Sequence, residues 1–180
     1  DVTAEAVKVI EAIGDRFGRR FELERLPYGA DHYLETGVAM PPNGYRTLQK
    51  DFDAIFIGAL GDPRIPDMRH ARDILLGTRF ELDLYVNYRP VKLLDARLCP
   101  LKGCCPTDVD FVVFRENTEG MYVGVGGRFK ADTTNEVAIQ EEINTYAGVH
   151  RIIKYAFEYA SSAARRRLCM ADKSNALQHG

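Results

Sequence analysis

The sequence predicts an α/β protein with a largely parallel β-sheet. Helical periods alternate with short apolar runs along the chain, which is the order of elements in parallel sheets. One run, Ala54–Gly58, is apolar throughout and ends at glycine, as strands buried on both faces do. The glycine- and proline-rich segment 58–67 follows it, and ligands bind beyond the carboxyl ends of such strands. We therefore expect a binding loop there.

The first half of the chain is expected to be mostly helical. Residues 2–13 place Ala6, Val9 and Ile13 at three- and four-residue steps, which predicts an amphipathic helix ending near Gly14. The other elements expected in this half are a strand at 21–28, a short helix at 45–51, the strand at 54–58 and a helix at 69–82.

The second half is expected to contain a hairpin arm and the longest helix. A strand at 84–94, interrupted at Pro90, is followed by a buried strand at 111–114. Residues 121–130 and 136–144 predict two extended ribbons joined by the polar turn 131–135. A continuous apolar stripe over 147–166 predicts a long helix, and 168–171 predicts a final short strand.

Charge and composition favour a soluble protein with a small-molecule partner. The 180 residues carry 24 basic and 26 acidic side chains, spread along the chain, for a formal net charge of −2. This balance argues against a nucleic-acid or membrane surface, and no apolar run approaches the roughly 20 residues that span a bilayer. We expect a cytoplasmic protein that binds neither nucleic acid nor membrane.

Three of the four cysteines, Cys99, Cys104 and Cys105, fall in one short stretch, and the fourth is Cys169. The stretch lacks the paired Cys-x-x-Cys spacing of metal knuckles and has no histidine close by. A metal or disulfide role is conceivable, but reduced loop thiols are the expected state in a cytoplasmic chain.

Three arginines are candidates for binding a substrate with two carboxylates. Arg79, Arg89 and Arg115 occur on three successive elements, each near a strand end or on a helix bordering the same side of the predicted sheet. Guanidinium groups bind carboxylates through two parallel hydrogen bonds, so three that converge would hold a diacid. Any one of them taken alone is more often a surface arginine, so the prediction depends on the set of three together with the motifs around them.

Three short sequence motifs, two of which contain Arg89 and Arg115, resemble those of a known family. They are Asn87-Tyr-Arg-Pro90, Arg115-Glu-Asn-Thr-Glu-Gly120 with Tyr122 following, and Asp172-Lys-Ser-Asn175. In this order they resemble the signature segments of the β-decarboxylating dehydrogenases, which include isocitrate, 3-isopropylmalate, D-malate and tartrate dehydrogenases. The likeness covers nearly all of residues 1–180. It implies a two-domain isopropylmalate dehydrogenase-like fold with a protruding hairpin arm, truncated at both ends.

The resemblance implies a role for each of these side chains. Arg79, Arg89 and Arg115 correspond to the arginines that hold the substrate carboxylates, and Tyr122 to the acid that protonates the product carbanion. Lys173 corresponds to the base, and neighbouring cations would lower the pKa of such a lysine. The alternative readings are a tyrosine packed in an interface and an ordinary lysine at a strand end.

Cofactor binding is implied by the resemblance alone, because no G-x-G-x-x-G opens a helix. The family uses NAD with Mg²⁺ or Mn²⁺. The loop matching Leu60, Gly61 and Asp62, together with Asn175, implies contacts to NAD. The metal-binding aspartates are expected beyond Gly180, so no metal ligand is assigned in this chain, which is expected to be part of a longer protein and inactive alone.

The resemblance also implies two domains and a homodimer. Residues 1–83 would form part of the cofactor-side domain and residues 84–180 part of the substrate and dimerisation domain, with the arm at about 119–146. Two subunits would pair through the arm and the 147–166 helix. Lys173 would then serve the partner subunit's site.

The helix before Arg79 is expected to select the substrate. Asp73 and Leu75 stand where isocitrate enzymes have serine and asparagine, so a third carboxylate would meet repulsion and an apolar wall. Leu75 and Leu76 resemble the pair that holds the isopropyl group of 3-isopropylmalate, a contact worth about 1–3 kcal/mol. Arg72 and the wording around Arg89 instead resemble the D-malate and tartrate branch. We expect 3-isopropylmalate, as in leucine biosynthesis, with D-malate or tartrate as the alternative.

A third possibility is a non-catalytic regulatory subunit of the same fold. Loss of the tyrosine, the lysine or one of the arginines would indicate such a subunit, and all five are present.

Overall fold

A computed structural model describes residues 2–163 and 166–179. The chain forms two compact units that divide between Leu82 and Asp83. The boundary expected from the sequence lay after residue 83. The assignment of the two parts to cofactor and substrate roles remains a prediction.

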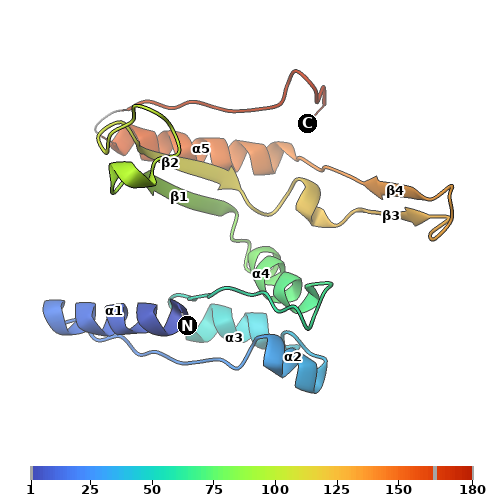
Figure 1. Ribbon diagram of the computed structural model, residues 1–180, viewed down its shortest axis with the longest axis horizontal. Helices are drawn as coiled ribbons and strands as arrows, with labels where there is room; N and C mark the ends of the chain where they lie inside the picture. The colour runs from blue at the N-terminus through green and yellow to red at the C-terminus, as the bar shows by residue number, and fades with distance from the viewer. Residues whose placement is uncertain (1, 164–165, 180) are drawn as a thin grey trace. The chain divides into compact units, whose positions relative to one another are not determined.

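The first unit is helical within its described residues. Its helices are α1 (Val2–Phe17), α2 (Ala30–Thr36), α3 (Gly44–Asp51) and α4 (Arg69–Glu81), joined by long extended segments (Figure 1). Helices α1, α3 and α4 lie where the periodicity predicts them, whereas α2, bounded by Gly29 and Gly37, was not expected.

The buried residues of this unit are centred on α4. His70, Ala71, Ile74 and Thr78 recur at three- and four-residue steps and form its inner face. Helix α2 packs on this face through Tyr33, whose ring centroid lies 6.0 Å from that of His70.

Helix α1 continues one turn beyond the expected end. Gly14 is buried inside it, and the helix stops before Gly18, whose φ of 61° lies in the left-handed region that glycine tolerates. The amide of Arg19 donates back to the carbonyl of Gly14 at 2.9 Å, which is the six-to-one bond of a glycine-terminated helix. Gly18 is therefore the terminator, and Gly14 allows close packing.

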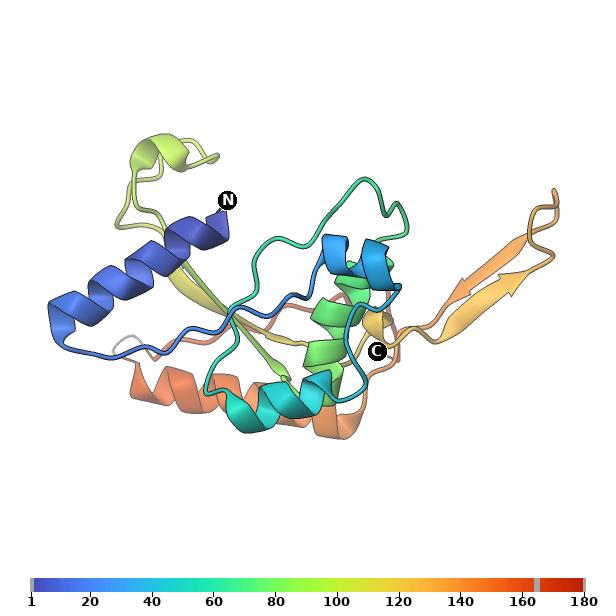
Figure 2. The same ribbon diagram turned by 90° about the horizontal axis from the view of Figure 1, so that it is seen from below.

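The second unit contains two antiparallel pairs of strands and one long helix. Strands β1 (Val86–Lys92) and β2 (Asp110–Glu116) form one sheet, and β3 (Gly126–Phe129) and β4 (Val137–Gln140) form a projecting hairpin (Figure 2). Helix α5 (Tyr146–Ser162) follows the hairpin, and the short 3-10 helices η1 (Ala96–Leu98) and η2 (Met121–Val123) lie in the connections. Pro90 does not interrupt β1, which a strand paired on one side tolerates.

Helix α5 lies along the β1–β2 sheet (Figure 1), and aromatic side chains join the helix to one face of the sheet. Tyr88 and Phe114 are cross-strand partners, and their rings meet Tyr159 at centroid distances of 5.9 and 4.9 Å. Tyr155 lies 5.5 Å from Phe114 on the same face. These contacts determine which face of the sheet stays open, because alternate residues of a strand point to opposite faces.

The expectation of a largely parallel sheet is wrong for the described residues, which form only antiparallel pairs. Residues 21–28, 54–58 and 168–171 are not strands. A strand is defined by its hydrogen-bonded neighbour, and none of these runs has one within the described chain. Phe56, for example, is 58% exposed. Helix α5 ends at Ser162 rather than at 166, and residues 164–165 of the expected end lie outside the described residues.

Candidate active site

The open face of the β1–β2 sheet carries the two arginines predicted in this unit. Asn87 pairs with Arg115 across the strands, and Arg89 lies two residues from Asn87 on the same face. The intervening Tyr88 points to α5, as the aromatic contacts above show. Strand alternation therefore places both guanidinium groups on the face that α5 leaves open.

Tyr122 lies beside one of these arginines. The guanidinium carbon of Arg115 is 4.9 Å from the centroid of the Tyr122 ring, a cation–π contact. Tyr122 belongs to η2, which Gly120 (φ 78°) and Gly124 (φ 73°) bound on either side. Both angles are positive, so the sharp turns that carry the tyrosine back to Arg115 require glycine. The Tyr122 residue is 44% exposed.

The residues after Arg115 fix the end of β2. The carboxylate of Glu116 accepts hydrogen bonds from the amides of Thr118 and Glu119, both at 2.7 Å, and from Nη2 of Arg151 at 2.9 Å. Arg151 also donates to Asp83 at 2.9 Å. Burial is the largest single influence on the pKa of Glu116 and raises it, but these hydrogen bonds together outweigh burial and lower the pKa. Glu116 is therefore held as a carboxylate.

Glu119 joins the same motif to the start of α5. Its carboxylate accepts hydrogen bonds from the amide of Thr145 at 2.8 Å and from the Thr145 hydroxyl at 2.5 Å. Thr145 is the N-cap of α5, and its hydroxyl oxygen accepts from the amide of Gly148 at 3.0 Å. The strand end, the η2 turn and the helix start are thus tied together around Arg115.

Asn117 and Asn87 link the motif to the other arginine. Nδ2 of Asn117 donates to the carbonyl of Leu84 at 3.2 Å, and Nδ2 of Asn87 donates to Oδ1 of Asn117 at 3.1 Å. Oδ1 of Asn87 in turn accepts from Nε of Arg89 at 2.7 Å. Sequence patterns alone gave no role to Asn87, Asn117 or Arg151, although Asn87 and Asn117 stand inside the quoted motifs.

Lys173 and Asn175 lie in a turn near the end of the chain. The amides of Ala176 and Leu177 donate to the carbonyl of Lys173, both at 2.9 Å, and the Lys173 amide donates to Oδ1 of Asp172 at 2.7 Å. Lys173 is exposed, and no hydrogen bond or ion pair joins it to Arg89, Arg115 or Tyr122 among the described residues. Within the described residues, no hydrogen bond therefore links the predicted base to the predicted acid.

The remaining predicted substrate residues lie on α4 in the first unit. Leu75 and Arg79 are four residues apart and share a face, and Leu76 is adjacent. This face is distinct from the inner one formed by Ile74 and Thr78. Leu75 is 37% exposed, so it is free to contact a ligand.

The loop predicted to contact NAD is held by an ion pair. Asp62 accepts hydrogen bonds from Nε of Arg64 at 2.8 Å and from Nη2 at 2.6 Å, and Arg64 also donates to Asp31 at 2.7 Å. The side-chain hydrogen bonds from Arg64 lower the pKa of Asp62 to about 2. The Asp62–Arg64 pair thus stabilises the loop, in which Gly61 is exposed and Leu60 is half-buried.

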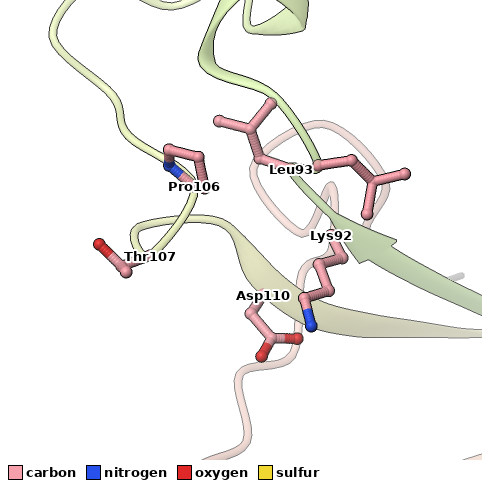
Figure 3. A pocket seen from close by; sticks show the side chains of 6 residues that line it. Lys92, Leu93, Pro106, Thr107 and Asp110 are labelled. Atoms are coloured by element: carbon pink, nitrogen blue, oxygen red, sulfur yellow. The ribbon is translucent and has the colours of Figure 1, made fainter.

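A hollow of about 410 Å³ occurs at the far end of the β1–β2 sheet, where Lys92 and Asp110 are register partners (Figure 3). Its lining residues are Lys92, Leu93, Leu94, Pro106, Thr107 and Asp110.

All four cysteines are free thiols. In the described ranges no group of three or more His, Cys, Asp or Glu side chains could hold a metal ion, and no helix there is long and apolar enough to cross a membrane.

Comparison with known proteins identifies the class to which this fold and site belong. The family model described as isocitrate/isopropylmalate dehydrogenase matches residues 1–180, and the chain belongs to that family. An isocitrate dehydrogenase structure from Methylococcus capsulatus superposes with a TM-score of 0.65 at 29% identity, over 89% of this chain and 43% of that one. The family expectation drawn from the motif words is confirmed.

Individual relatives within the family carry different names. The chain is 43% identical to a decarboxylating D-malate dehydrogenase of Escherichia coli, over 98% of this chain and 49% of the relative. It is 41% identical to a probable tartrate dehydrogenase/decarboxylase of Agrobacterium vitis, over 100% of this chain and 50% of the relative. It is 38% identical to a 3-isopropylmalate dehydrogenase of Thermobifida fusca, over 99% and 50%. The chain thus spans about half the length of these relatives.

Proposed function

We propose that the whole protein catalyses the NAD-dependent, divalent-metal-assisted oxidative decarboxylation of a 2-hydroxy diacid in the cytoplasm. The observation that carries the proposal is the open face of the β1–β2 sheet, where Arg89, Arg115 and the hydroxyl-bearing Tyr122 lie together in a chain of the decarboxylating family. Two cations suit a dianionic substrate, and a phenol beside one of them suits proton donation.

The proposed chemistry assigns one task to each side chain. Arg89 and Arg115 bind substrate carboxylates, a role that the family resemblance also gives to Arg79. Lys173 takes the proton of the C2 hydroxyl as the C2 hydride leaves to NAD⁺, and it acts in the partner subunit's site of a homodimer. After the C3 carboxylate departs as CO₂, Tyr122 donates a proton to C3.

The cofactors are part of the proposal for the whole protein. For NAD⁺, the chain would contribute the loop at Leu60 and Gly61, shaped by the Asp62–Arg64 pair, and Asn175. For Mg²⁺ or Mn²⁺ the described residues do not fit, because they offer no group of three ligands. No step above is therefore routed through a metal held by this chain.

The first substrate to test is 3-isopropylmalate. Leu75 and Leu76 are adjacent on the ligand-accessible side of α4, one turn before Arg79, and Leu75 is 37% exposed. A leucine pair with one exposed member, one turn before the predicted carboxylate-binding Arg79, favours a substrate with a branched apolar substituent. Such a contact changes the ratio of kcat/KM between substrates with and without the apolar substituent by about 10- to 200-fold.

D-malate and tartrate are the second candidate. Arg72 lies on the same helix face as Leu75 and Arg79, so this face carries a further cation beside the leucines. The relatives at 43% and 41% identity are named as acting on D-malate and tartrate. A smaller, more polar substrate would suit that arrangement.

The test is NADH formation by the full-length protein with Mg²⁺ or Mn²⁺ and 3-isopropylmalate, D-malate, tartrate or isocitrate. Tyr122→Phe should lower kcat by about 10²- to 10⁴-fold with a small change in KM, because the ring stays on Arg115 while the acid is lost. Tyr146→Phe is the matched control, since Tyr146 is 86% exposed at the start of α5. Lys173→Ala should also abolish turnover.

The outcomes separate the candidates. Preference for D-malate or tartrate over 3-isopropylmalate would overturn the leucine argument alone. No activity with any of the four would contradict the proposed function and favour the regulatory subunit.

A further inference from the structure

We propose that Asn87 and Asn117 are positioning residues that fix the guanidinium of Arg89 on the open face of the β1–β2 sheet. The inference rests on the proposed function for the role of Arg89 as a carboxylate-binding residue. The two asparagines do not touch the substrate in this proposal. They act through Arg89 alone.

The three side chains form a relay with a fixed end. Asn117 is 6% exposed, its amide donates to the carbonyl of Tyr85 at 3.0 Å, and its Nδ2 donates to the carbonyl of Leu84 at 3.2 Å. Two backbone carbonyls before β1 thus hold both the main chain and the side chain of Asn117. The remaining side-chain atom, Oδ1, faces Asn87 and accepts from its Nδ2 at 3.1 Å.

The direction of each amide follows from this anchor. Because Nδ2 of Asn117 is used by a carbonyl, Oδ1 must face Asn87, and only the Nδ2 of Asn87 can donate to it. Oδ1 of Asn87 is then left to accept from Nε of Arg89 at 2.7 Å. A reversed Asn87 amide would face oxygen with oxygen and nitrogen with guanidinium, so the network has one favourable arrangement.

The relay also decides which edge of Arg89 meets a ligand. Arginine has five N–H donors in a planar fork, and Asn87 takes the one on Nε. No hydrogen bond or ion pair from the two terminal nitrogens of Arg89 occurs among the described residues. Those nitrogens form the edge that binds a carboxylate through two parallel bonds. The asparagines therefore orient the terminal edge of Arg89 toward the substrate.

A spectroscopic test reads the relay without turnover. In the full-length protein, the Nε–H resonance of Arg89, identified by its loss in Arg89→Lys, should be observable near neutral pH because the hydrogen bond slows its exchange with water. It should disappear in Asn87→Ala and in Asn117→Ala and persist in Asn135→Ala, an asparagine in the hairpin turn. Absence in the wild type, or persistence in Asn87→Ala, overturns the proposal.

A kinetic cycle tests whether the asparagines act through the arginine. Asn87→Ala and Arg89→Lys should each raise the diacid KM by about 10- to 100-fold and leave the KM for NAD⁺ unchanged. Lysine keeps the charge but has no Nε donor, so Asn87→Ala should add almost nothing in the Arg89→Lys background. Additive effects, or a matching rise in the KM for NAD⁺, would show a general structural role and overturn the proposal.

The two tests separate this inference from the proposed function. If the wild type turns over no 2-hydroxy diacid but the resonance follows the expected pattern, the proposed function fails and the positioning of Arg89 stands. If the wild type is active and the Arg89 Nε–H resonance persists in Asn87→Ala, the proposed positioning of Arg89 is wrong and the proposed function stands. Asn117→Ala, the variant most exposed to misfolding, is interpreted only with an unchanged circular dichroism spectrum, and Asn87→Ala decides the proposal by itself.

Discussion

Nη2 of Arg151, on α5, lies 2.9 Å from Oε1 of Glu116, at the end of β2. The same guanidinium binds both carboxylate oxygens of Asp83 through Nη1, and its carbon lies 4.5 Å from the centroid of the Tyr85 ring. The Arg151 and Glu116 side chains are 30% and 15% exposed. This partly buried network connects α5 to the strand that carries Arg115.

Removing Arg151 should destabilise the protein. Arg151→Met keeps most of the apolar stem but leaves the partly buried Glu116 without its cation, so we expect a loss of about 2–3 kcal/mol in the free energy of unfolding. Urea denaturation of the full-length protein measures it. Lys154→Met is the control on the same helix, because the Lys154–Glu158 pair is exposed at 3.8 Å and should contribute less than about 0.5 kcal/mol. Equal losses of unfolding free energy in the two variants would contradict the stabilising role of the Arg151–Glu116 pair.

Acid should weaken the same network. The pKa of Glu116 in the folded chain lies below its ordinary value of 4.5, so its ionisation stabilises the fold above that value and the contribution is lost as pH falls through the folded pKa. The difference in unfolding free energy between the wild type and Glu116→Gln should therefore be constant near neutral pH. It should shrink as the pH is lowered below 4.5. A difference that stays constant over this acid range would refute the lowered pKa.

Gly148→Ala should reverse the usual ranking of helix formers. Alanine normally stabilises a helix by about 1 kcal/mol relative to glycine. At this position a Cβ would overlap the Glu119 carboxylate that holds Thr145, so we expect a loss of about 1–3 kcal/mol instead. In a Glu119→Ala background the same substitution should become neutral or stabilising. Thermal melts of the wild type, the two single variants and the double variant measure the coupling between Gly148 and Glu119, and additive effects would count against it.

Much of the local structure was predictable because it depends on short-range patterns. The apolar periods of α1, α4 and α5 and the alternating ribbons of the β3–β4 hairpin locate those elements to within a few residues. Which segments pair with one another as strands was less predictable. The run at 54–58 has the composition of a buried strand, but a strand needs a neighbour, and no other described segment supplies one. Helix α2 was missed because its seven residues carry little periodicity.

The candidate site, like the fold, was predictable from the sequence only in part. The motif words named Arg89, Arg115 and Tyr122, and the structure places these three on one face. The motifs alone did not show what the neighbouring residues within them do. Glu116, Asn117 and Glu119 hold parts of the chain distant in sequence, and such partners become visible only in three dimensions. Lys173 and Asn175 were also named by the motif, and their roles stay predictions.

The sequence by itself determined the family and the positions of most helices, and it named the side chains that are proposed to perform the chemistry. These follow from residue types at fixed spacings, which a single chain displays directly. Only the tertiary structure decided which face of the β1–β2 sheet is open, because the packing of Tyr155 and Tyr159 on the other face sets it. It also decided how Arg89 is oriented, since hydrogen bonds between residues about 30 positions apart depend on register and not on local propensity.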